Sequence, residues 1–217
     1  MKRTILCVAA LVMAMTGMAM AEEGWTPLFN GKDLSAWQEP AAAKWKVVDG
    51  VLTWEKDCGN LWTKEKFGDF VLDLEVKVDK GSNSGLFLRS PEGEKNWLNG
   101  SIEIQVSGSY GPDRKPGKHD MGAMYDCLAP SVAAEKPVGE WNHYVLTFKG
   151  NLLKIVLNDK TIIDANLDDW KEAGKNPDGS KNKFNTAYKD MAKSGHLGLQ
   201  DHGQTVWYRN IKIRPLK

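Results

Sequence analysis

Polar side chains interrupt two segments that otherwise have the pattern of well-packed strands. In SIEIQV the isoleucines and the valine share one face, so Glu103 and Gln105 project from the other, about 7 Å apart by the rise of a strand. In GHLGLQDHG the two leucines take the core face, and Gln200 and His202 share the opposite parity. A carboxylate, two amides and an imidazole on one surface could bind a polar ligand and move a proton.

A third segment, SNSGLFLRS, adds an aromatic ring and a guanidinium. Its leucines take the core parity, which sends Phe87 and Arg89 to the other face. An aromatic ring beside an arginine can hold a polar, ring-shaped ligand such as a sugar. If the wet faces of these strands belong to one sheet, that sheet forms a concave polar site on a rigid floor. Its lining would be Arg89, Glu103, Gln105, Gln200 and His202.

The motif KHDMGAMYD supplies further groups that bind metals or transfer protons. It contains His119, Asp120, Tyr125 and Asp126. Together with the Asp-His pair that ends GHLGLQDHG, these are oxygen and nitrogen ligands suited to a divalent ion, and we select His119 and Asp201 as candidate metal ligands. The chain has no HExxH, paired Cys-x-x-Cys or EF-hand spacing, so no motif specifies which ion would bind.

Each candidate also has a structural interpretation. Glu103 could lie on a solvated outer face, and His202 could end a strand in solvent. In GEWNHY, Trp141 is a candidate substrate contact, although its place at the entry to a strand favours packing, with Asn142 capping the turn.

The elements that position these residues are predicted to be strands. In FVLDLEVKVD, residues 70–79, apolar and charged side chains alternate, which is typical of an antiparallel strand with one wet face. Similar runs occur at residues 46–54, 86–89, 101–106, 144–148, 152–157, 196–200 and 206–213. Turn residues separate them at Asp49-Gly50, Asn99-Gly100, Lys149-Gly150-Asn151 and Asn158-Asp159. Many short strands punctuated in this way predict a β-sandwich or barrel.

Two longer segments break the strand rhythm. The first long loop, residues 107–137, is rich in glycine, proline and charge, and the second long loop, residues 166–194, has room for one or two short helical turns. Ordered loops of this length are often functional, so both are candidate lids, or else solvated decoration.

The N-terminal residues and the charge balance limit the partners. Lys2 and Arg3 precede an apolar run that ends in Ala19-Met20-Ala21, which is typical of a cleaved signal peptide over residues 1–21. Residues 22–217 then form a single exported domain, periplasmic or secreted, without a membrane anchor. Without the leader's two basic residues the net charge is about −1, which argues against nucleic acid as a partner. Cys58 and Cys127 remain in this domain and could pair or stay reduced.

The motifs taken together resemble the 3-keto-disaccharide hydrolase family of bacterial exported proteins. They are FNGKDLSAWQ, NSGLFLRS, GSIEIQV, GAMYD, KPVGEWNHY and GHLGLQDHGQTVWYRNIKIR, which span nearly all of residues 22–217. The resemblance implies a concanavalin A-like jelly roll of two curved antiparallel sheets with a carbohydrate site on the concave side. It also implies action on small glycosides already oxidised at C3.

The chemistry implied by this resemblance starts from the C3 carbonyl, which acidifies the C2 proton. A base removes that proton, the enolate expels the C1 substituent and water then adds, with a divalent ion or a hydrogen-bond donor stabilising the enolate. On this sequence the resemblance makes Glu103 or His202 the base and Tyr125 a possible acid. Substrate hydroxyls would be oriented by Gln105 and Arg89, with Gln200 and Trp141 as further contacts. Metal binding or proton transfer would fall to His119, Asp201 and His202.

One position departs from the family pattern. The family commonly has Glu-x-Gln followed three residues later by Asp, whereas this chain has Gly108, so any role of that acid is lost or moves to Asp113 or Asp120. An ordinary two-carboxylate glycosidase needs a second acid close to Glu103, which the Glu-x-Gln strand lacks. A lectin-like binding module is the alternative without catalysis, because the fold supports both. Catalysis requires ionisable groups in a shared pocket, whereas binding needs aromatic rings and amides.

Overall fold

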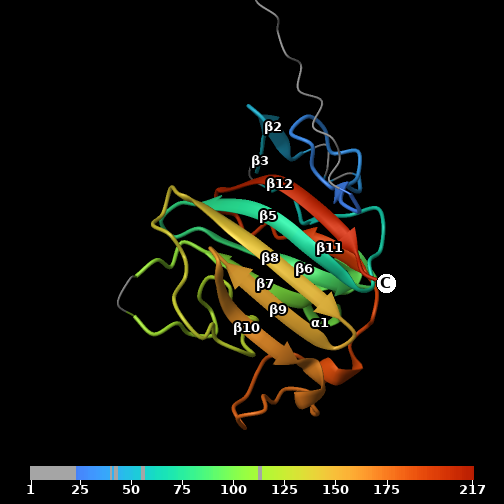
Figure 1. Ribbon diagram of the computed structural model, residues 1–217, viewed down its shortest axis with the longest axis vertical. Helices are drawn as coiled ribbons and strands as arrows, with labels where there is room; N and C mark the ends of the chain where they lie inside the picture. The colour runs from blue at the N-terminus through green and yellow to red at the C-terminus, as the bar shows by residue number, and fades with distance from the viewer. Residues whose placement is uncertain (1–22, 40, 42–43, 55–56, 112–113) are drawn as a thin grey trace, which may run out of the picture.

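The computed structural model describes residues 23–217 except residues 40, 42–43, 55–56 and 112–113. The predicted signal peptide, residues 1–21, lies outside the described residues. The strands form two antiparallel sheets stacked one behind the other (Figure 1). The predicted all-β sandwich of jelly-roll type is confirmed.

The larger sheet has eight strands. Seven follow the order β10-β9-β8-β5-β12-β3-β2, and β1 pairs with β12 outside this path. Their bounds are β1 (Thr26–Pro27), β2 (Lys46–Val48), β3 (Val51–Thr53), β5 (Phe70–Val78), β8 (Trp141–Lys149), β9 (Leu152–Leu157), β10 (Lys160–Asn166) and β12 (Val206–Pro215).

The smaller sheet has four strands in the order β4-β11-β6-β7. Their bounds are β4 (Leu61–Trp62), β6 (Asn83–Ser90), β7 (Ile102–Ser107) and β11 (His196–Leu199). A 3-10 turn, η2 (Gly93–Asn96), and a one-turn helix, α1 (Trp97–Gly100), connect β6 to β7. This sheet therefore brings together all three segments whose parity suggested chemistry.

The core fills the space between the two sheets. Alternate residues of β5, from Phe70 to Val78, are buried against alternate residues of β7, including Ile104 and Val106, in one hydrophobic cluster. Because side chains alternate across a strand, the residues between them on β7 must face away from the core. The packing of the inner face of the four-stranded sheet therefore determines which side chains lie on its outer face.

Left-handed backbone marks two of the predicted turns. Asp49 and Gly50 have φ values of 51° and 76°, and Asn158 and Asp159 have 48° and 66°. Two consecutive positive φ angles are typical of two-residue hairpin turns, here joining β2 to β3 and β9 to β10. The predicted tight turn at Asn99-Gly100 is wrong, because these residues complete α1.

Three strands were not expected from the sequence. β1 and β4 have only two residues each, and β10 carries a register shift between Thr161 and Ile163 that interrupts its alternation. The second long loop contains the short helical turns that were expected, η3 (Leu167–Asp169) and η4 (Tyr188–Asp190). Within the described residues, no helix is long and apolar enough to cross a bilayer.

The two cysteines of the described chain do not form a disulfide with each other. Cys58 and Cys127 are both buried, and Cys58 Sγ contacts Lys44 O at 3.2 Å. Burial raises the pKa of the Cys127 thiol to about 12, which keeps it protonated and unreactive.

Candidate active site

Glu103 and Gln105 project from β7 onto the outer face of the four-stranded sheet, yet both are buried. Glu103 is 5% exposed and Gln105 is 3% exposed, which excludes the solvated interpretation of this face. Gln200, which directly follows β11, is 5% exposed, and its Nε2 donates to Glu103 Oε1 at 3.3 Å. The predicted grouping of these three side chains is therefore what the fold produces.

Gly85 of β6 lies between these side chains and makes room for them. A Cβ atom at this position would come within 3.0 Å of Glu103 Oε1 and 3.3 Å of Gln200 Oε1. Gln200 N donates to Gly85 O at 2.9 Å, and Gly85 pairs with Gln105 across the ladder. A glycine inside a strand often marks such a close approach, and here it lets two polar heads meet across an intervening strand.

The electrostatics of Glu103 are those of a buried base. Burial raises the pKa of this carboxyl above its usual value. The positive charge of Lys183, the hydrogen bond from Gln200 and the charges of His202 and His119 oppose this effect in part. The carboxylate therefore lies within reach of three cationic or titratable groups.

Two buried amide oxygens next to Glu103 lack partners. Among the described residues, neither Gln105 Oε1 nor Gln200 Oε1 has a hydrogen-bond donor. Gln105 Nε2 donates to Asn83 Oδ1 at 3.0 Å, which fixes the orientation of that amide. A buried acceptor without a partner costs about 1–3 kcal/mol, so both oxygens are suited to accept hydrogen bonds from a ligand's hydroxyls.

Tyr125 and Lys183 flank the carboxylate. Tyr125 N donates to Glu103 O at 2.9 Å, and Lys183 Nζ lies 4.1 Å from the centre of the Tyr125 ring. Burial raises the pKa of the Tyr125 phenol, and the negative charges of Glu103 and Asp126 add to the effect, so the hydroxyl stays protonated. The His119 ring lies 4.8 Å from the Tyr125 ring, centre to centre, so it belongs to the same side of the site.

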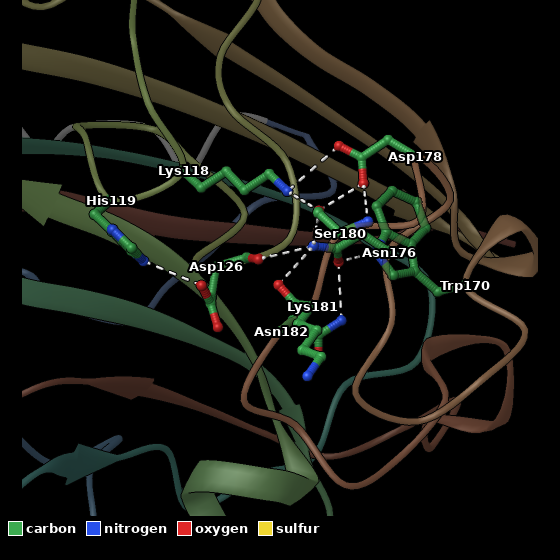
Figure 2. Close-up of polar contacts among 9 residues, drawn as sticks. All are labelled: Lys118, His119, Asp126, Trp170, Asn176, Asp178, Ser180, Lys181 and Asn182. Carbon is green, nitrogen blue, oxygen red and sulfur yellow. Dashed lines mark hydrogen bonds and ion pairs between the residues drawn. The ribbon is translucent and has the colours of Figure 1, made fainter.

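Polar contacts join the two long loops (Figure 2). Asn176, which is 3% exposed, donates through Nδ2 to Asp126 O at 3.1 Å, and Lys118 Nζ donates to Ser180 Oγ at 2.6 Å. Lys183 N donates to Asp126 Oδ2 at 2.7 Å. The second long loop thus places the Lys183 ammonium group over the Tyr125 ring.

A cavity of about 440 Å³ opens beside Gln200. Its other walls come from the turn that follows β11, from the segment before β4, and from η2 and α1. The lining residues are Gly59, Asn60, Glu94, Trp97, Gln200, Asp201 and His202. His202 is exposed in this cavity, and its charge acts on Glu103. Its exposure agrees with the interpretation that it ends a strand in solvent, and a role in catalysis stays a prediction.

Aromatic rings form one side of the outer face. The Trp62 and Phe87 rings stack with centres 5.3 Å apart, and the Trp97 ring lies 5.2 Å from that of Phe87. Trp62 Nε1 donates to Glu94 Oε2 at 2.7 Å. Gly198 makes room for the Trp62 ring, because a Cβ atom at position 198 would lie only 2.5 Å from Trp62 Cζ3. Trp62 and Phe87 are buried, at 3% and 1% exposed, so Trp97 is the ring of these three that lines the cavity.

Arg89 does not lie on this surface, so its expected role as a substrate contact is wrong. The ladder between β6 and β11 shifts register, and Arg89 adopts a φ of 53°, which reverses the parity set by Phe87. Its guanidinium, 2% exposed, donates to Asp69 Oδ1 at 2.8 Å and to Gly150 O at 2.6 Å. It also lies 3.6 Å from the centre of the Phe148 ring, so it is a structural group of the core.

Trp141 lies on the other sheet and cannot contact a ligand at Glu103. It begins β8, faces away from the core, and stacks with Arg209 at 4.1 Å and Lys77 at 5.2 Å. Asn142 next to it is fully buried, and its Oδ1 accepts from Lys136 N at 2.8 Å. The packing interpretation of this segment is confirmed, and the expected substrate contact is wrong.

The candidate metal ligands do not gather into a binding site. In the described chain, no three His, Cys, Asp or Glu side chains are placed to hold a metal ion. The Asp201 carboxylate accepts hydrogen bonds from Trp54 Nε1, Gly59 N and Gly203 N, while His119 pairs with Asp126 at 3.2 Å. These donors already bind both oxygens of the Asp201 carboxylate. The residues present therefore do not fit a metal, and no step of the reaction is assigned to one.

The departure at Gly108 has a steric cause. A Cβ at this position would lie 2.1 Å from Asp79 O in the turn between β5 and β6, which excludes the family's usual aspartate here without a shift of the backbone. Of the two alternatives, Asp113 lies outside the described residues, and Asp120 Oδ2 already accepts from Arg114 at 2.5 Å and from Gly117 N at 2.6 Å.

A larger cavity lies elsewhere in the described structure. It has a volume of about 870 Å³ and lies on the outer face of the eight-stranded sheet. Two of its acidic side chains are paired, Asp73 with His143 at 3.0 Å and Glu75 with Arg209 at 2.9 Å. Satisfied groups of this kind stabilise the sheet, whereas the buried amide oxygens beside Glu103 still lack a partner.

Four residues of the site were not predicted: Trp62, Glu94, Trp97 and Lys183. Three of them come from a two-residue strand and from short turns, where no period assigns a face. The glycines at 85 and 198 were the available clue, since a glycine inside an apolar strand indicates close approach of another group.

A family model described as the 3-keto-alpha-glucoside-1,2-lyase-like domain matches residues 24–214. The chain is 26% identical to the 3-keto-disaccharide hydrolase of Bacteroides thetaiotaomicron, over 89% of this chain and 79% of that protein. It also resembles two solved structures of provisionally named glycosyl hydrolases from Parabacteroides distasonis ATCC 8503. The first has 35% identity and a TM-score of 0.79, covering 88% of this chain and 99% of that one. The second has 25% identity and a TM-score of 0.71, covering 90% and 95%.

The fold and site define a carbohydrate-active β-sandwich. The chain belongs to the 3-keto-alpha-glucoside-1,2-lyase-like domain family. The family indicated by the sequence motifs is thereby confirmed.

Proposed function

We propose that this chain is an exported enzyme that cleaves 3-keto-glycosides, including 3-keto-disaccharides. One observation carries the proposal: a buried carboxylate, Glu103, faces two buried amide oxygens that have no partner in the described structure. Family membership and the name of the Bacteroides relative support the substrate class. The N-terminal leader pattern supports export.

The first step is removal of the proton at C2 of the oxidised sugar. The C3 carbonyl acidifies this proton, and Glu103 is the base that takes it. Because burial raises the pKa of Glu103, its ionised form is a stronger base than an exposed glutamate. Gln105 and Gln200 accept hydrogen bonds from ring hydroxyls and hold C2 over the carboxylate.

The negative charge that develops on the C3 oxygen needs a stabilising partner. Lys183 and the Tyr125 hydroxyl flank Glu103 on the side of the long loops and supply a positive charge and a hydrogen-bond donor. Such preorganised groups commonly contribute about 10²–10³ to the rate. The Tyr125 phenol, whose pKa is raised, stays protonated and donates without itself losing a proton.

The C1 substituent then leaves as the enolate electrons form the C1–C2 double bond. His202 in the cavity beside Gln200 protonates the departing oxygen. The product is an unsaturated 3-keto sugar, and water adds across its double bond, hydroxide to C1 and a proton to C2. The balance over both stages is hydrolysis of the glycosidic bond.

A lectin-like module is a poorer explanation of this surface. Binding alone needs aromatic rings and amides, which the site has, but gains nothing from a buried carboxylate beside a lysine, a tyrosine and a histidine. Burying a carboxylate costs free energy, which brings no benefit to a binding site. In an enzyme the same burial raises the pKa of the carboxyl and makes the carboxylate a stronger base.

The test is incubation of the purified protein with an aryl 3-keto-glucoside, with and without a chelator, while aglycone release is followed. Carrying out the reaction in heavy water adds a second readout, because proton abstraction at C2 exchanges that hydrogen and nuclear magnetic resonance detects the loss of its signal. Release together with exchange at C2 supports the proposal. An absence of release under both conditions refutes it, and loss of activity only with chelator shows that a metal takes part.

Two variants assign the roles in this assay. His202→Ala should slow release while C2 exchange continues, because the acid acts on the leaving group after the proton has gone. Glu75→Gln, a matched change on the opposite sheet, should leave both readouts unchanged. Loss of C2 exchange in His202→Ala to the same extent as loss of release would contradict the role of His202 as acid, and loss of either readout in Glu75→Gln would contradict the placement of the site on the four-stranded sheet.

A further inference from the structure

The cavity beside Gln200 lies where a leaving group must go if Glu103 takes the C2 proton. C1 and C2 are neighbouring atoms, so the group attached to C1 extends from a point close to the base. Gln200 is shared by the two places: its Nε2 donates to Glu103 Oε1 at 3.3 Å, and its side chain lines the cavity. Gln200 is 5% exposed, and its Oε1 has no hydrogen-bond partner among the described residues. This oxygen therefore lies between Glu103 and the cavity and can accept a hydrogen bond from a ligand.

The walls of the cavity combine one aromatic ring with several acceptors. Trp97 is half-buried and its ring is braced by Phe87, 5.2 Å away between centres. Glu94 Oε2 accepts from Trp62 Nε1 at 2.7 Å and from Asn60 Nδ2 at 3.0 Å, which holds the carboxylate at the rim. Asp201 also lines the cavity, and the N–H groups of Gly59 and Gly203 donate to its carboxylate.

We infer that this cavity is the subsite for the leaving group, and that it takes a second, uncharged sugar ring stacked on Trp97. The assignment of this cavity to the leaving group rests on the proposed function. The choice of a neutral sugar ring as its ligand rests on the residues that line the cavity. Hydroxyl groups of a sugar donate to the acceptors, and its C–H face packs against the indole. The two carboxylates, Glu94 and Asp201, repel a leaving group that carries a carboxylate or phosphate.

Direct binding of sugars that cannot react separates this inference from the proposed function. Isothermal titration calorimetry measures the affinity of the protein for an unoxidised glucosyl-glucose disaccharide and for methyl glucoside, which lacks the second ring. In the wild-type protein the disaccharide should bind about tenfold more tightly, because its second ring adds contacts worth roughly 1.4 kcal/mol. Trp97→Ala should remove this advantage, whereas Trp207→Ala, a tryptophan of the eight-stranded sheet, should retain it.

A disaccharide with a charged second ring tests whether the carboxylates of the cavity repel a negatively charged ligand. A disaccharide whose second ring is a uronic acid should bind more weakly than the neutral one, and Glu94→Gln should reduce that difference while keeping an acceptor for Trp62. Equal affinity of wild-type protein for methyl glucoside and disaccharide overturns the subsite. Retention of the advantage in a folded Trp97→Ala protein also overturns it. A disaccharide advantage that depends on Trp97, together with no cleavage of any 3-keto-glycoside, supports the subsite and refutes the proposed function.

Discussion

Replacement of Glu103 by glutamine should abolish turnover and stabilise the fold. Glutamine has nearly the same shape and keeps an oxygen that can accept from Gln200 Nε2, so packing changes little. It cannot remove a proton, and loss of a general base costs about 10²–10⁴ in rate. The assay is aglycone release from a 3-keto-glucoside.

The stability effect follows from the direction of the pKa shift. Burial raises the pKa of Glu103 in the folded state. Its contribution to stability is therefore fully present below the unfolded value of about 4.3 and is lost as the pH rises through the folded value. At neutral pH the wild-type protein bears the cost of a buried charge, which the glutamine variant does not.

We expect Glu103→Gln to be more stable than the wild type by about 1 kcal/mol near pH 7, the usual size of gain when a functional site is relieved of strain. For a domain of this length that raises the Tm by about 2–4 °C. The difference should disappear near pH 4, where both side chains are neutral. Thermal unfolding at the two pH values measures it.

Glu75→Gln is the matched control, with the opposite sign. Hydrogen bonds from Arg209 are the main cause of a lowered pKa at Glu75, although burial opposes them. Its contribution to stability is present above the unfolded value and lost as the pH falls through the folded one. This variant should lose stability at neutral pH and keep its activity. If Glu103→Gln lowers the Tm at neutral pH, the description of Glu103 as a strained catalytic base is refuted.

Three further changes test the positions of neighbouring groups. Lys183→Met should lower kcat by about 10²–10³, and it should shift the acid limb of the kcat/KM profile to higher pH, since Lys183 opposes the raised pKa of Glu103; an unchanged profile contradicts this. Gly198→Ala places a Cβ 2.5 Å from Trp62 Cζ3, and overpacking of this kind costs about 1–3 kcal/mol, measurable by chemical denaturation. Arg89→Met removes a buried guanidinium whose partner, Asp69, is partly exposed, so the free energy of unfolding should fall by about 1–3 kcal/mol while kcat per folded molecule stays unchanged. A selective loss of substrate affinity in a stable Arg89→Met protein would restore Arg89 to the site.

The strands that carry the site were predictable because their inner faces are regular. Isoleucine and leucine at every second position fix which residues of β7 and β11 face the core. Glu103 and Gln105 follow from that alternation, because each lies between two core residues, and Gln200 follows because it comes directly after the core residue Leu199. The prediction failed at Arg89 because a register shift reverses the parity, and no neighbouring residue indicates it.

The sequence by itself determined the sandwich, the turns at Asp49-Gly50 and Asn158-Asp159, and the polar set on β7 and β11, because each depends on the local alternation of side chains or on backbone preference. Tertiary structure alone decided that the charge of Lys183 acts on Glu103 and that Trp97 and Glu94 line a cavity beside Gln200. These contacts join segments that lie far apart in the chain and follow no period. They depend on how loops of irregular sequence pack across a sheet, and that is set by the whole fold.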